Sequence, residues 1–137
     1  MQKYKFLEHT ADIKFQAFGK SLKEVFENSV LAVSEVLRKE KKIKSVKKKL
    51  LVVKGKDNEN LLQNLLEEII YLLDAKNFVV SKAKINFDKN IRNIRVEFFG
   101  DDVKNYKDLQ HIKAVTYSEM FVKNQGNKWI TQVVLDI

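Results

Sequence analysis

Chemically active residue types are scarce in this chain, and most familiar catalytic sets cannot be built from them. The sequence has no cysteine and only two histidines, His9 and His111. Without cysteine there is no thiolate nucleophile, no iron–sulfur cluster and no cysteine-type zinc site. The four glycines form no G-x-S-x-G, Walker A or G-x-G-x-x-G motif. Binding, assembly and metal chemistry on carboxylates therefore remain as the open functions.

The segment Glu8-His9-Thr10-Ala11-Asp12 places polar and small residues between two stretches with strand-like patterns. An ordinary turn explains this composition, with Asp12 accepting hydrogen bonds from nearby backbone amides. Its histidine and its carboxylate also make the segment a candidate site.

A second candidate is the segment Lys113-Ala114-Val115-Thr116-Tyr117. Strand alternation puts Lys113, Val115 and Tyr117 on one face. Either Lys113 extends along the surface beside a core valine, or its ammonium group is delivered to a pocket.

The strand pattern of Trp129–Ile137 continues to the final residue. If the strand continues to Ile137, the Asp136 side chain and the terminal carboxylate of Ile137 come close together. Two like charges at that distance repel each other unless a cation lies between them. The alternative is that the last two residues fray, as chain ends usually do.

The net charge of +8 is concentrated in one segment, because residues 39–56 carry nine lysines and one glutamate and the rest of the chain sums to zero. A basic chain suggests nucleic acid. Only three of the 26 basic residues are arginines, the type that dominates base and phosphate recognition. The pattern therefore favours a solvated, lysine-protected sheet edge, with a specific RNA site as the alternative.

Hydrophobic periodicity predicts an α+β fold in which two helices pack on mostly antiparallel sheet. The expected order is strand, strand, helix, strand, helix and then four strands. Strands are expected at 3–9, 13–18, 43–54, 78–87, 91–99, 111–123 and 128–137, and helices from a Ser21–Glu24 capping box to about Arg38 and from the 55–58 turn to about Asp74. Residues 100–110 are expected to form a loop.

The second predicted helix is leucine-rich and apolar around more than half of its circumference, which indicates a central packing element. Its acidic residues Glu67, Glu68 and Asp74 are expected to be solvated. The length of 137 residues suits one domain, 1–137, which could consist of two interlocked halves, about 1–56 and 57–137.

No stretch is long and apolar enough to span a membrane, and the first residues lack a signal-peptide pattern. A cytoplasmic location without a membrane partner is therefore expected.

Taken together, these segments resemble the archease family. The features are the His9-Thr10-Ala11-Asp12-Ile13 motif, the helix ending in Tyr71-Leu72-Leu73-Asp74, the Lys113-Ala114-Val115-Thr116-Tyr117 strand and the terminal stretch Trp129…Asp136-Ile137. Each motif alone is weak, but all four in this order across nearly the whole chain are specific.

The resemblance implies a small protein of strand-helix-strand-strand modules that is not itself an enzyme. It implies an accessory role with the RtcB-type RNA-splicing ligase, which joins tRNA exon halves using GTP and a divalent metal. The accessory protein promotes guanylylation and multiple turnover of the ligase, and it reaches tRNA only through that enzyme. A second function attributed to the family is chaperone-like, towards a tRNA-modifying methyltransferase.

The resemblance also maps the family's metal site onto Asp12, Asp136 and the carboxylate of Ile137. Three oxygen donors without sulfur suit a hard divalent cation, calcium in a crystal and magnesium or manganese in function. His9 is expected to orient Asp12 beside the metal. Lys113 is the candidate for contact with the ligase, its nucleotide or a carboxylate of the site.

Three positions depart from the family pattern. Lys14 stands where members often have glycine, and Ser118 stands where many have histidine after the Thr-Tyr pair. His111, only two residues before Lys113, is the candidate for the role of the family's loop histidine.

Two other functions remain open. One is an RNA- or phosphate-binding module that uses the lysines of 39–56. The other is a metal-dependent hydrolase on the same carboxylates, which is disfavoured because no obvious base or nucleophile accompanies them.

Overall fold

The computed structural model describes residues 1–39, 41–89 and 93–137. Its elements are β1 (Tyr4–Leu7), β2 (Ile13–Gly19), α1 (Leu22–Leu37), β3 (Lys47–Lys54), α2 (Asn58–Lys76), β4 (Phe78–Phe87), β5 (Asn93–Asp102), the 3-10 turn η1 (Val103–Asn105), β6 (Ala114–Gln125) and β7 (Lys128–Asp136). The predicted order of strands and helices and the α+β class are confirmed.

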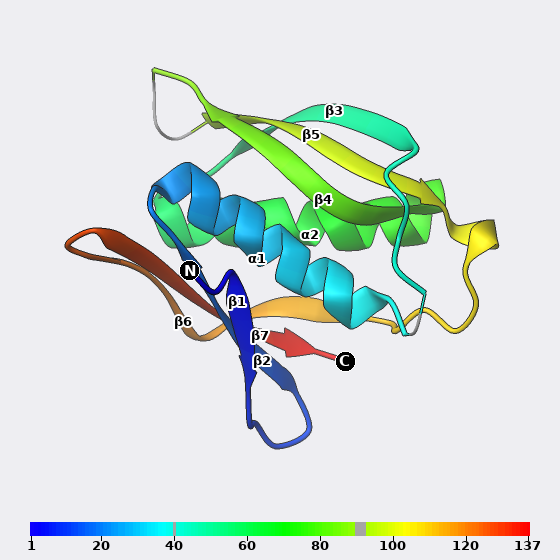
Figure 1. Ribbon diagram of the computed structural model, residues 1–137, viewed down its shortest axis with the longest axis horizontal. Helices are drawn as coiled ribbons and strands as arrows, with labels where there is room; N and C mark the ends of the chain where they lie inside the picture. The colour runs from blue at the N-terminus through cyan, green and yellow to red at the C-terminus, as the bar shows by residue number, and fades with distance from the viewer. Residues whose placement is uncertain (40, 90–92) are drawn as a thin grey trace.

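The strands form two antiparallel sheets, and the two helices lie between them (Figure 1). One sheet has the order β1-β2-β7-β6 and the other has the order β3-β5-β4. Each sheet combines strands from residues 1–56 with strands from residues 57–137. Residues of both segments also share one hydrophobic core, in which Phe15, Phe26 and Phe98 are fully buried.

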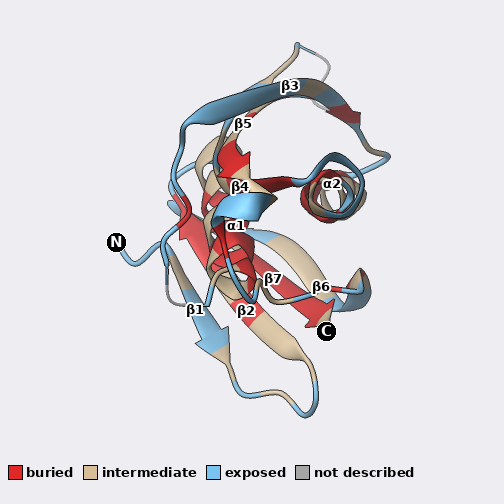
Figure 2. Cartoon of the chain, turned by 90° about the vertical axis from the view of Figure 1, so that its right-hand side faces the viewer, coloured by how far each residue is buried: buried red, intermediate tan, exposed pale blue. Residues whose placement is uncertain are grey.

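Burial is greatest where the helices face the sheets, and the exposed positions lie on the outer strands and loops (Figure 2). The predicted apolar stripe of α1 accounts for this, since Val25, Phe26, Val30 and Val33 are fully buried. In α2 the leucine and isoleucine pairs bury two faces, one towards each sheet.

Both helices begin at a side-chain cap. Ser21 Oγ accepts a hydrogen bond from Glu24 N at 3.1 Å, and the Glu24 carboxylate accepts one from Lys20 N rather than from Ser21 N. The predicted capping box is therefore present with its return bond shifted by one residue. The α2 helix begins in the same way at Asp57, whose carboxylate accepts from Asn60 N at 2.7 Å.

Several strand bounds differ from the prediction. The strand expected from residue 43 begins at Lys47, while Ile43 is buried in the core outside the strand. The expected loop at 100–110 starts later, because β5 continues to Asp102. The strand expected from His111 begins at Ala114. The turn expected at 88–90 and the strand start at 91 lie partly outside the described residues.

The hairpin between β6 and β7 is tighter than the four-residue turn suggested by the sequence. Gln125 pairs with Lys128, so only Gly126 and Asn127 form the loop. Gly126 has a φ of 69°, a backbone conformation that costs glycine little. A glycine at the first loop position is typical of a two-residue hairpin.

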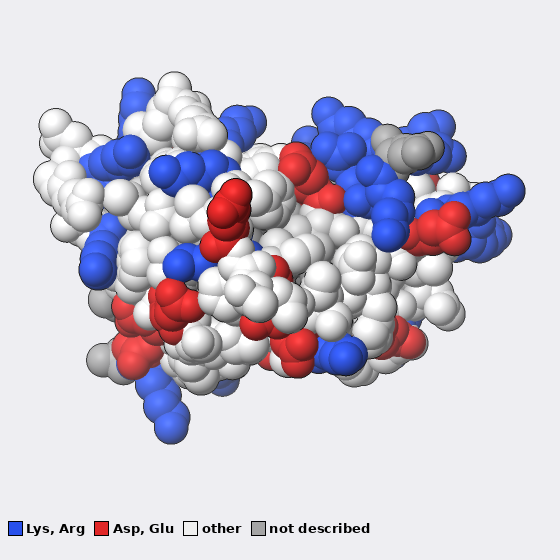
Figure 3. All heavy atoms as spheres, turned by 90° about the horizontal axis from the view of Figure 1, so that it is seen from below, with Lys and Arg blue, Asp and Glu red and all other residues white. Residues whose placement is uncertain are grey.

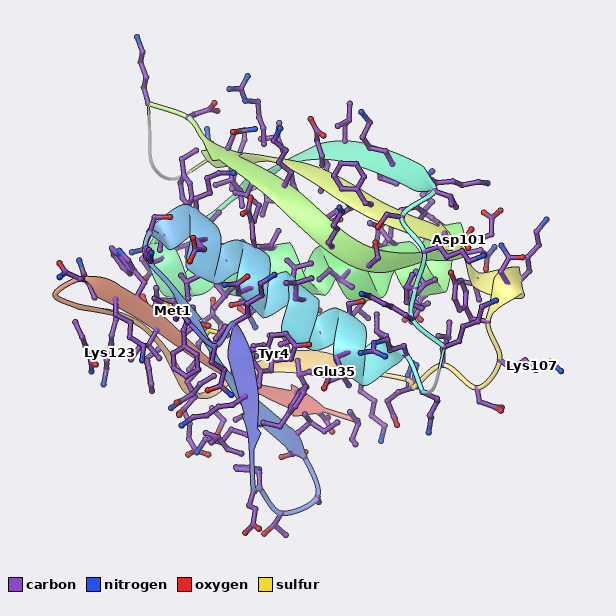
Figure 4. The ribbon with its side chains drawn as sticks, viewed as in Figure 1. Met1, Tyr4, Glu35, Asp101, Lys107 and Lys123 are labelled. Carbon is purple, nitrogen blue, oxygen red and sulfur yellow. The ribbon has the colours of Figure 1, made fainter. Side chains whose placement is uncertain are left out.

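The first strand is tied to α1 by a partly buried polar contact. The Tyr4 hydroxyl donates to Glu35 Oε1 at 2.6 Å, and the two side chains point towards each other across the gap between β1 and α1 (Figure 4). Partial burial, followed by the neighbouring Glu35 carboxylate, raises the pKa of Tyr4 to about 12. Tyr4 therefore stays neutral and keeps its hydroxyl proton for this bond.

The free edge of β6 is covered by polar side chains of α2. Glu67 Oε1 accepts from Val115 N at 3.2 Å, Gln63 Nε2 donates to Val115 O at 3.0 Å, and Glu59 Oε2 accepts from Val122 N at 3.1 Å. These bonds replace the missing neighbouring strand and close an edge that could otherwise pair with another chain. The expectation that Glu67 is solvated was therefore wrong, because this side chain is partly buried and caps the edge strand.

Replacing Glu67 by alanine is expected to lower the free energy of unfolding by about 1 kcal/mol, because the partly buried Val115 N–H loses its acceptor. Urea unfolding followed by circular dichroism measures the change. The matched control is Glu68→Ala on the neighbouring helix position, which should stay within about 0.5 kcal/mol of the wild type. Equal losses in the two variants would contradict the edge-capping role.

Candidate functional site

The loop between β1 and β2 carries the first candidate residues, His9 and Asp12. It projects beyond the four-stranded sheet at the lower end of the molecule (Figure 1). Ala11 has a φ of 65°, which is uncommon for a residue with a Cβ and bends the chain just before Asp12. His9 and Asp12 have 24% and 33% of their side chains exposed, so both are half-buried.

A β-bulge in β6 brings Glu119 to the same place. The register of β6 against β7 shifts between Thr116 and Phe121, and Glu119 within this stretch has a φ of 57°. Gln132 of β7 donates its side-chain amide to Glu119 O at 2.7 Å and fixes the bulge. Positive φ at a residue that is not glycine costs free energy, and such residues cluster at functional sites.

The Glu119 carboxylate binds two side chains, His9 from the loop between β1 and β2 and Lys14 from β2. Lys14 Nζ lies 2.9 Å from Oε1, and His9 Nε2 lies 2.9 Å from Oε2. The hydrogen bond from Lys14, followed by the one from His9, lowers the pKa of Glu119 below its usual value. Glu119 is therefore ionised at neutral pH, and His9 must carry its hydrogen on Nε2 to donate to it.

In a neutral imidazole ring this arrangement leaves the other nitrogen, Nδ1, as an acceptor. Nδ1 is buried and has no hydrogen-bond partner within the described part of the chain. It lies 3.8 Å from Asp12 Oδ2, which is too long for a direct hydrogen bond. Two acceptors that face each other at this distance call for a donor or a cation between them.

Strand pairing sets Asp12 next to Asp136. Ile13 pairs with Leu135 as the last pair of the β2–β7 ladder, and Asp12 and Asp136 are the next residues beyond that pair. Asp136 still belongs to β7, whereas Asp12 lies in the bend before β2. On the other side of β7, Ala114 pairs with Asp136, and Lys113 N donates to Asp136 O at 2.7 Å. Lys113 thus lies opposite Ile137.

The structure brings five of the six predicted site residues to one end of the four-stranded sheet. They are Asp12, Asp136, Ile137, His9 and Lys113. The Lys113 side chain is exposed there. His111 is exposed as well and lines a separate hollow with Lys39, Lys41 and Lys107. The roles assigned to these residues stay predictions.

In the described ranges 1–39, 41–89 and 93–137, no three His, Cys, Asp or Glu side chains gather as a group that could hold a metal ion. A cation centre here would therefore depend on the main-chain carboxylate of Ile137 as well as on Asp12 and Asp136. Acidic side chains lie among basic ones on the side of the molecule where the four-stranded sheet lies, which Figure 3 views from below.

Sequence reasoning missed Glu119, Lys14 and Gln132 as parts of this cluster. Glu119 lies in a stretch that reads as an ordinary strand, and neither the bulge nor its positive φ can be seen from residue types. One signal is present in the sequence, since Lys14 stands where members of the family often have glycine. Its ammonium group is used in the structure as the partner of Glu119.

The fold and the site together define a small α+β protein whose polar cluster is built from strands of both ends of the chain. The chain belongs to the archease family. The family model described as the Archease protein family (MTH1598/TM1083) matches residues 4–137.

Named relatives agree with this membership along their whole length. "Protein archease" of Sulfurisphaera tokodaii is 35% identical over 100% of both chains. "Protein archease" of Methanosarcina barkeri is 37% identical over 99% of this chain and 97% of its own. Neither name states a reaction.

Solved structures share the fold. The solution structure of Methanobacterium thermoautotrophicum protein 1598 has a TM-score of 0.82 at 25% identity and covers all of both chains. The crystal structure of an archease, possible chaperone, from Thermotoga maritima has a TM-score of 0.63 at 23% identity over 96% of this chain and 94% of its own. No helix in the described residues is long and apolar enough to cross a membrane.

Removing the Glu119 carboxylate should loosen the loop of residues 8–12, because His9 and Lys14 then lose their common partner. In Glu119→Ala, backbone order parameters of the loop measured by NMR relaxation are expected to fall from about 0.85 to about 0.6 or below. Asp108→Ala is the matched control, since Asp108 is also an acidic residue with positive φ, at 57°. Unchanged order parameters in both variants would show that Glu119 does not hold the loop.

Proposed function

We propose that this protein is a metal-binding accessory protein that activates an RtcB-type RNA-splicing ligase in tRNA splicing. It promotes guanylylation and multiple turnover of the ligase, it is not itself an enzyme, and it works in the cytoplasm. Family membership supports the accessory role. The observation that supports the metal part is the strand register, in which the residues next to Asp12 and Asp136, namely Ile13 and Leu135, are paired at one end of the sheet.

The donor set fits a hard divalent cation. Asp12, just before β2, and Asp136, at the end of β7, would supply carboxylate oxygens, and the Ile137 carboxylate would supply a third group. Oxygen ligands without sulfur or several imidazoles favour calcium, magnesium or manganese over zinc. When bound, such a cation offsets the repulsion of the carboxylates and offers open positions to phosphate oxygens. We propose calcium as the occupant in a crystal and magnesium or manganese in function.

The surrounding residues hold these carboxylates in place. His9 is anchored through Nε2 to Glu119, so its ring is oriented with Nδ1 towards Asp12. Glu119 is in turn held by Lys14 and by Gln132. His9 therefore positions Asp12 through a bridging water molecule, because the 3.8 Å between Nδ1 and Asp12 Oδ2 is too long for a direct hydrogen bond. Lys113, exposed beside Ile137, is the group that would reach the ligase or the phosphates of its nucleotide.

An accessory role agrees better with this cluster than a hydrolase does. Glu119 is an ion-pair partner with a lowered pKa, and the free ring nitrogen of His9, Nδ1, is buried beside Asp12, so neither is poised to act on a substrate as a general base. Phosphodiester substrates incubated with manganese and the protein alone should stay intact. Turnover in that assay would make the protein an enzyme and overturn this part of the proposal.

A chaperone-like action on a tRNA methyltransferase is a second candidate. The observation in its favour is the description of the Thermotoga maritima relative as a possible chaperone. A function of that kind needs a partner surface but no cation. If this candidate is right, substitution of Asp12 or Asp136 leaves the chaperone-like action on the methyltransferase unchanged.

Substitution of the proposed ligands should weaken cation binding. Asp12→Asn and Asp136→Asn are each expected to raise the dissociation constant for manganese, measured by calorimetry, by about tenfold or more. Two residues added after Ile137 should have the same effect, because the terminal carboxylate becomes an amide. Asp74→Asn, on an exposed position of α2, is the matched control and should bind as the wild type does.

The same variants test the accessory role in a multiple-turnover ligation assay with the RtcB-type ligase. Wild type and Asp74→Asn should stimulate turnover and guanylylation, whereas Asp12→Asn and the extended chain should not. If the wild type gives no stimulation, the ligase role is wrong. If all variants stimulate equally while losing manganese, the metal has no part in the activity.

The lysines of 39–56 support the RNA-binding alternative through their exposure on β3. Lys48 and Lys49 are exposed on this edge strand, whereas Lys47 is engaged with Asp102 at 2.8 Å. If the strand is only a solvated edge, replacing Lys48 and Lys49 by glutamate leaves ligase stimulation and RNA affinity within about twofold of wild type. A strong, salt-dependent loss of RNA affinity in a filter-binding assay would favour the RNA module.

A further inference from the structure

A second polar site lies at the end of α1, apart from the carboxylates described above. The hollow there has a volume of about 890 Å³. It is bordered by Lys39 and Lys41 after α1 and by the loop between η1 and β6. The residues that line it are Lys39, Lys41, Asn105, Lys107, Asp108, Leu109, Gln110 and His111. Small-molecule sites commonly have volumes of roughly 300 to 1,000 Å³.

The lining is strongly unbalanced in charge. Lys39, Lys41 and Lys107 each contribute an ammonium group, and Asp108 is the one carboxylate among the lining residues within the described ranges 1–39, 41–89 and 93–137. Lys107 extends from the loop at the edge of the molecule (Figure 4). His111 adds a ring that can donate a hydrogen bond, and the amides of Asn105 and Gln110 belong to the same lining.

The loop that forms one wall is held by a buried network. Tyr106 donates its hydroxyl proton to Asp101 Oδ2 at 2.8 Å, and Asn105 donates to Asp101 Oδ1 at 3.1 Å. The bond from Tyr106 is the main reason that the pKa of Asp101 is lowered. Lys44 N donates to the Tyr106 hydroxyl at 2.8 Å, which ties the wall to the segment after α1.

The opposite side of the hollow is fixed as well. Gln110 N donates to Leu37 O at 2.8 Å, so the loop is bonded to the last turn of α1. Lys41 Nζ lies 3.3 Å from Asn105 O and 5.1 Å from the centre of the Tyr106 ring. Its ammonium group is therefore placed at the wall before any ligand arrives, which reduces the entropy lost on binding.

We propose that this hollow binds the phosphate groups of a small ligand, either a nucleotide or a free polyphosphate. Lysines recognise phosphate as point charges, and three of them around one concave site match an anion that carries several charges within a short span. An extended RNA strand spreads one charge over each nucleotide and would need a groove. The compact shape of the hollow therefore favours the small ligand.

A simpler explanation exists for the lysines nearest α1. Cationic side chains near the end of a helix stabilise its partial negative charge. That effect would make Lys41 a stability residue without any ligand. It does not account for Lys107, which lies on the opposite wall, so the two explanations predict different results for binding and for stability.

This proposal goes beyond the accessory function and does not use Asp12, Asp136 or Ile137. It is tested with the full chain alone, without ligase, in buffer containing a chelator. Isothermal calorimetry measures binding of tripolyphosphate, of GTP and of a single-stranded RNA 12-mer. The variants are Lys41→Ala/Lys107→Ala and, as a control with the same change in net charge, Lys20→Ala/Lys84→Ala at exposed positions outside the hollow.

The wild type should bind tripolyphosphate or GTP saturably, with one site per chain. Lys41→Ala/Lys107→Ala should weaken that binding by about tenfold or more, and the control should stay within about twofold. Equal affinity for both ligands identifies free phosphate groups as sufficient, and tighter binding of GTP identifies a nucleotide.

Three results would overturn the proposal. These are no saturable binding of either small ligand, binding of the RNA alone, and equal loss of affinity in the two double variants. Urea unfolding of the same variants shows whether a loss of binding follows from a loss of folding stability. A large loss of stability in Lys41→Ala/Lys107→Ala with unchanged phosphate binding would assign the lysines to helix stabilisation instead.

Discussion

The site of this archease depends on one strand, β7, which is paired on both sides. Its partners are β2, near the beginning of the chain, and β6, directly before it. Val133 and Leu135 are fully buried in the hydrophobic core, and Val134 between them is buried on the opposite face, so a shift by one residue would exchange the side chains that pack on the two faces. The same register sets Asp136 beside Asp12 and opposite Ala114. Core packing therefore determines where the carboxylates lie, although none of them belongs to the core.

The helix α2 has two structural roles, packing between the two sheets and bonding the edge strand β6. Its leucines and isoleucines fill the space between the two sheets, so one helix serves both. Its polar side chains bond the backbone of β6, the strand that carries the bulge with Glu119. A bulge interrupts regular pairing and weakens an edge strand. Support from the helix side keeps β6 in place on both sides of the interruption, so that Glu119 can reach across β7 to His9 and Lys14.

The elements could be predicted because their patterns are local. The stripe of α1 and the alternation of β2 and β7 follow from the spacing of apolar residues alone. The resemblance to a family gave Asp12, Asp136 and Ile137, which the strand register brings to one end of the sheet. Glu119 and Glu67 could not be predicted as contacts, since both act on groups that are distant in sequence and one depends on a positive φ. The start of β3 could not be predicted from apolar residues either, because Ile43 is buried in the core although the strand begins only at Lys47.

The pairing of β2 with β7 has a consequence for the order of events during folding. Ile13 meets Leu135 only after almost the entire chain has been made, and closing so large a loop is entropically costly. Proteins with many such distant contacts fold slowly. During synthesis β1 and β2 are made long before β7, so the edge of β2 that pairs with β7 stays exposed until the chain is nearly complete. The carboxylate cluster then exists only in molecules that have completed the fold, so a partly folded chain has no assembled site to offer a partner.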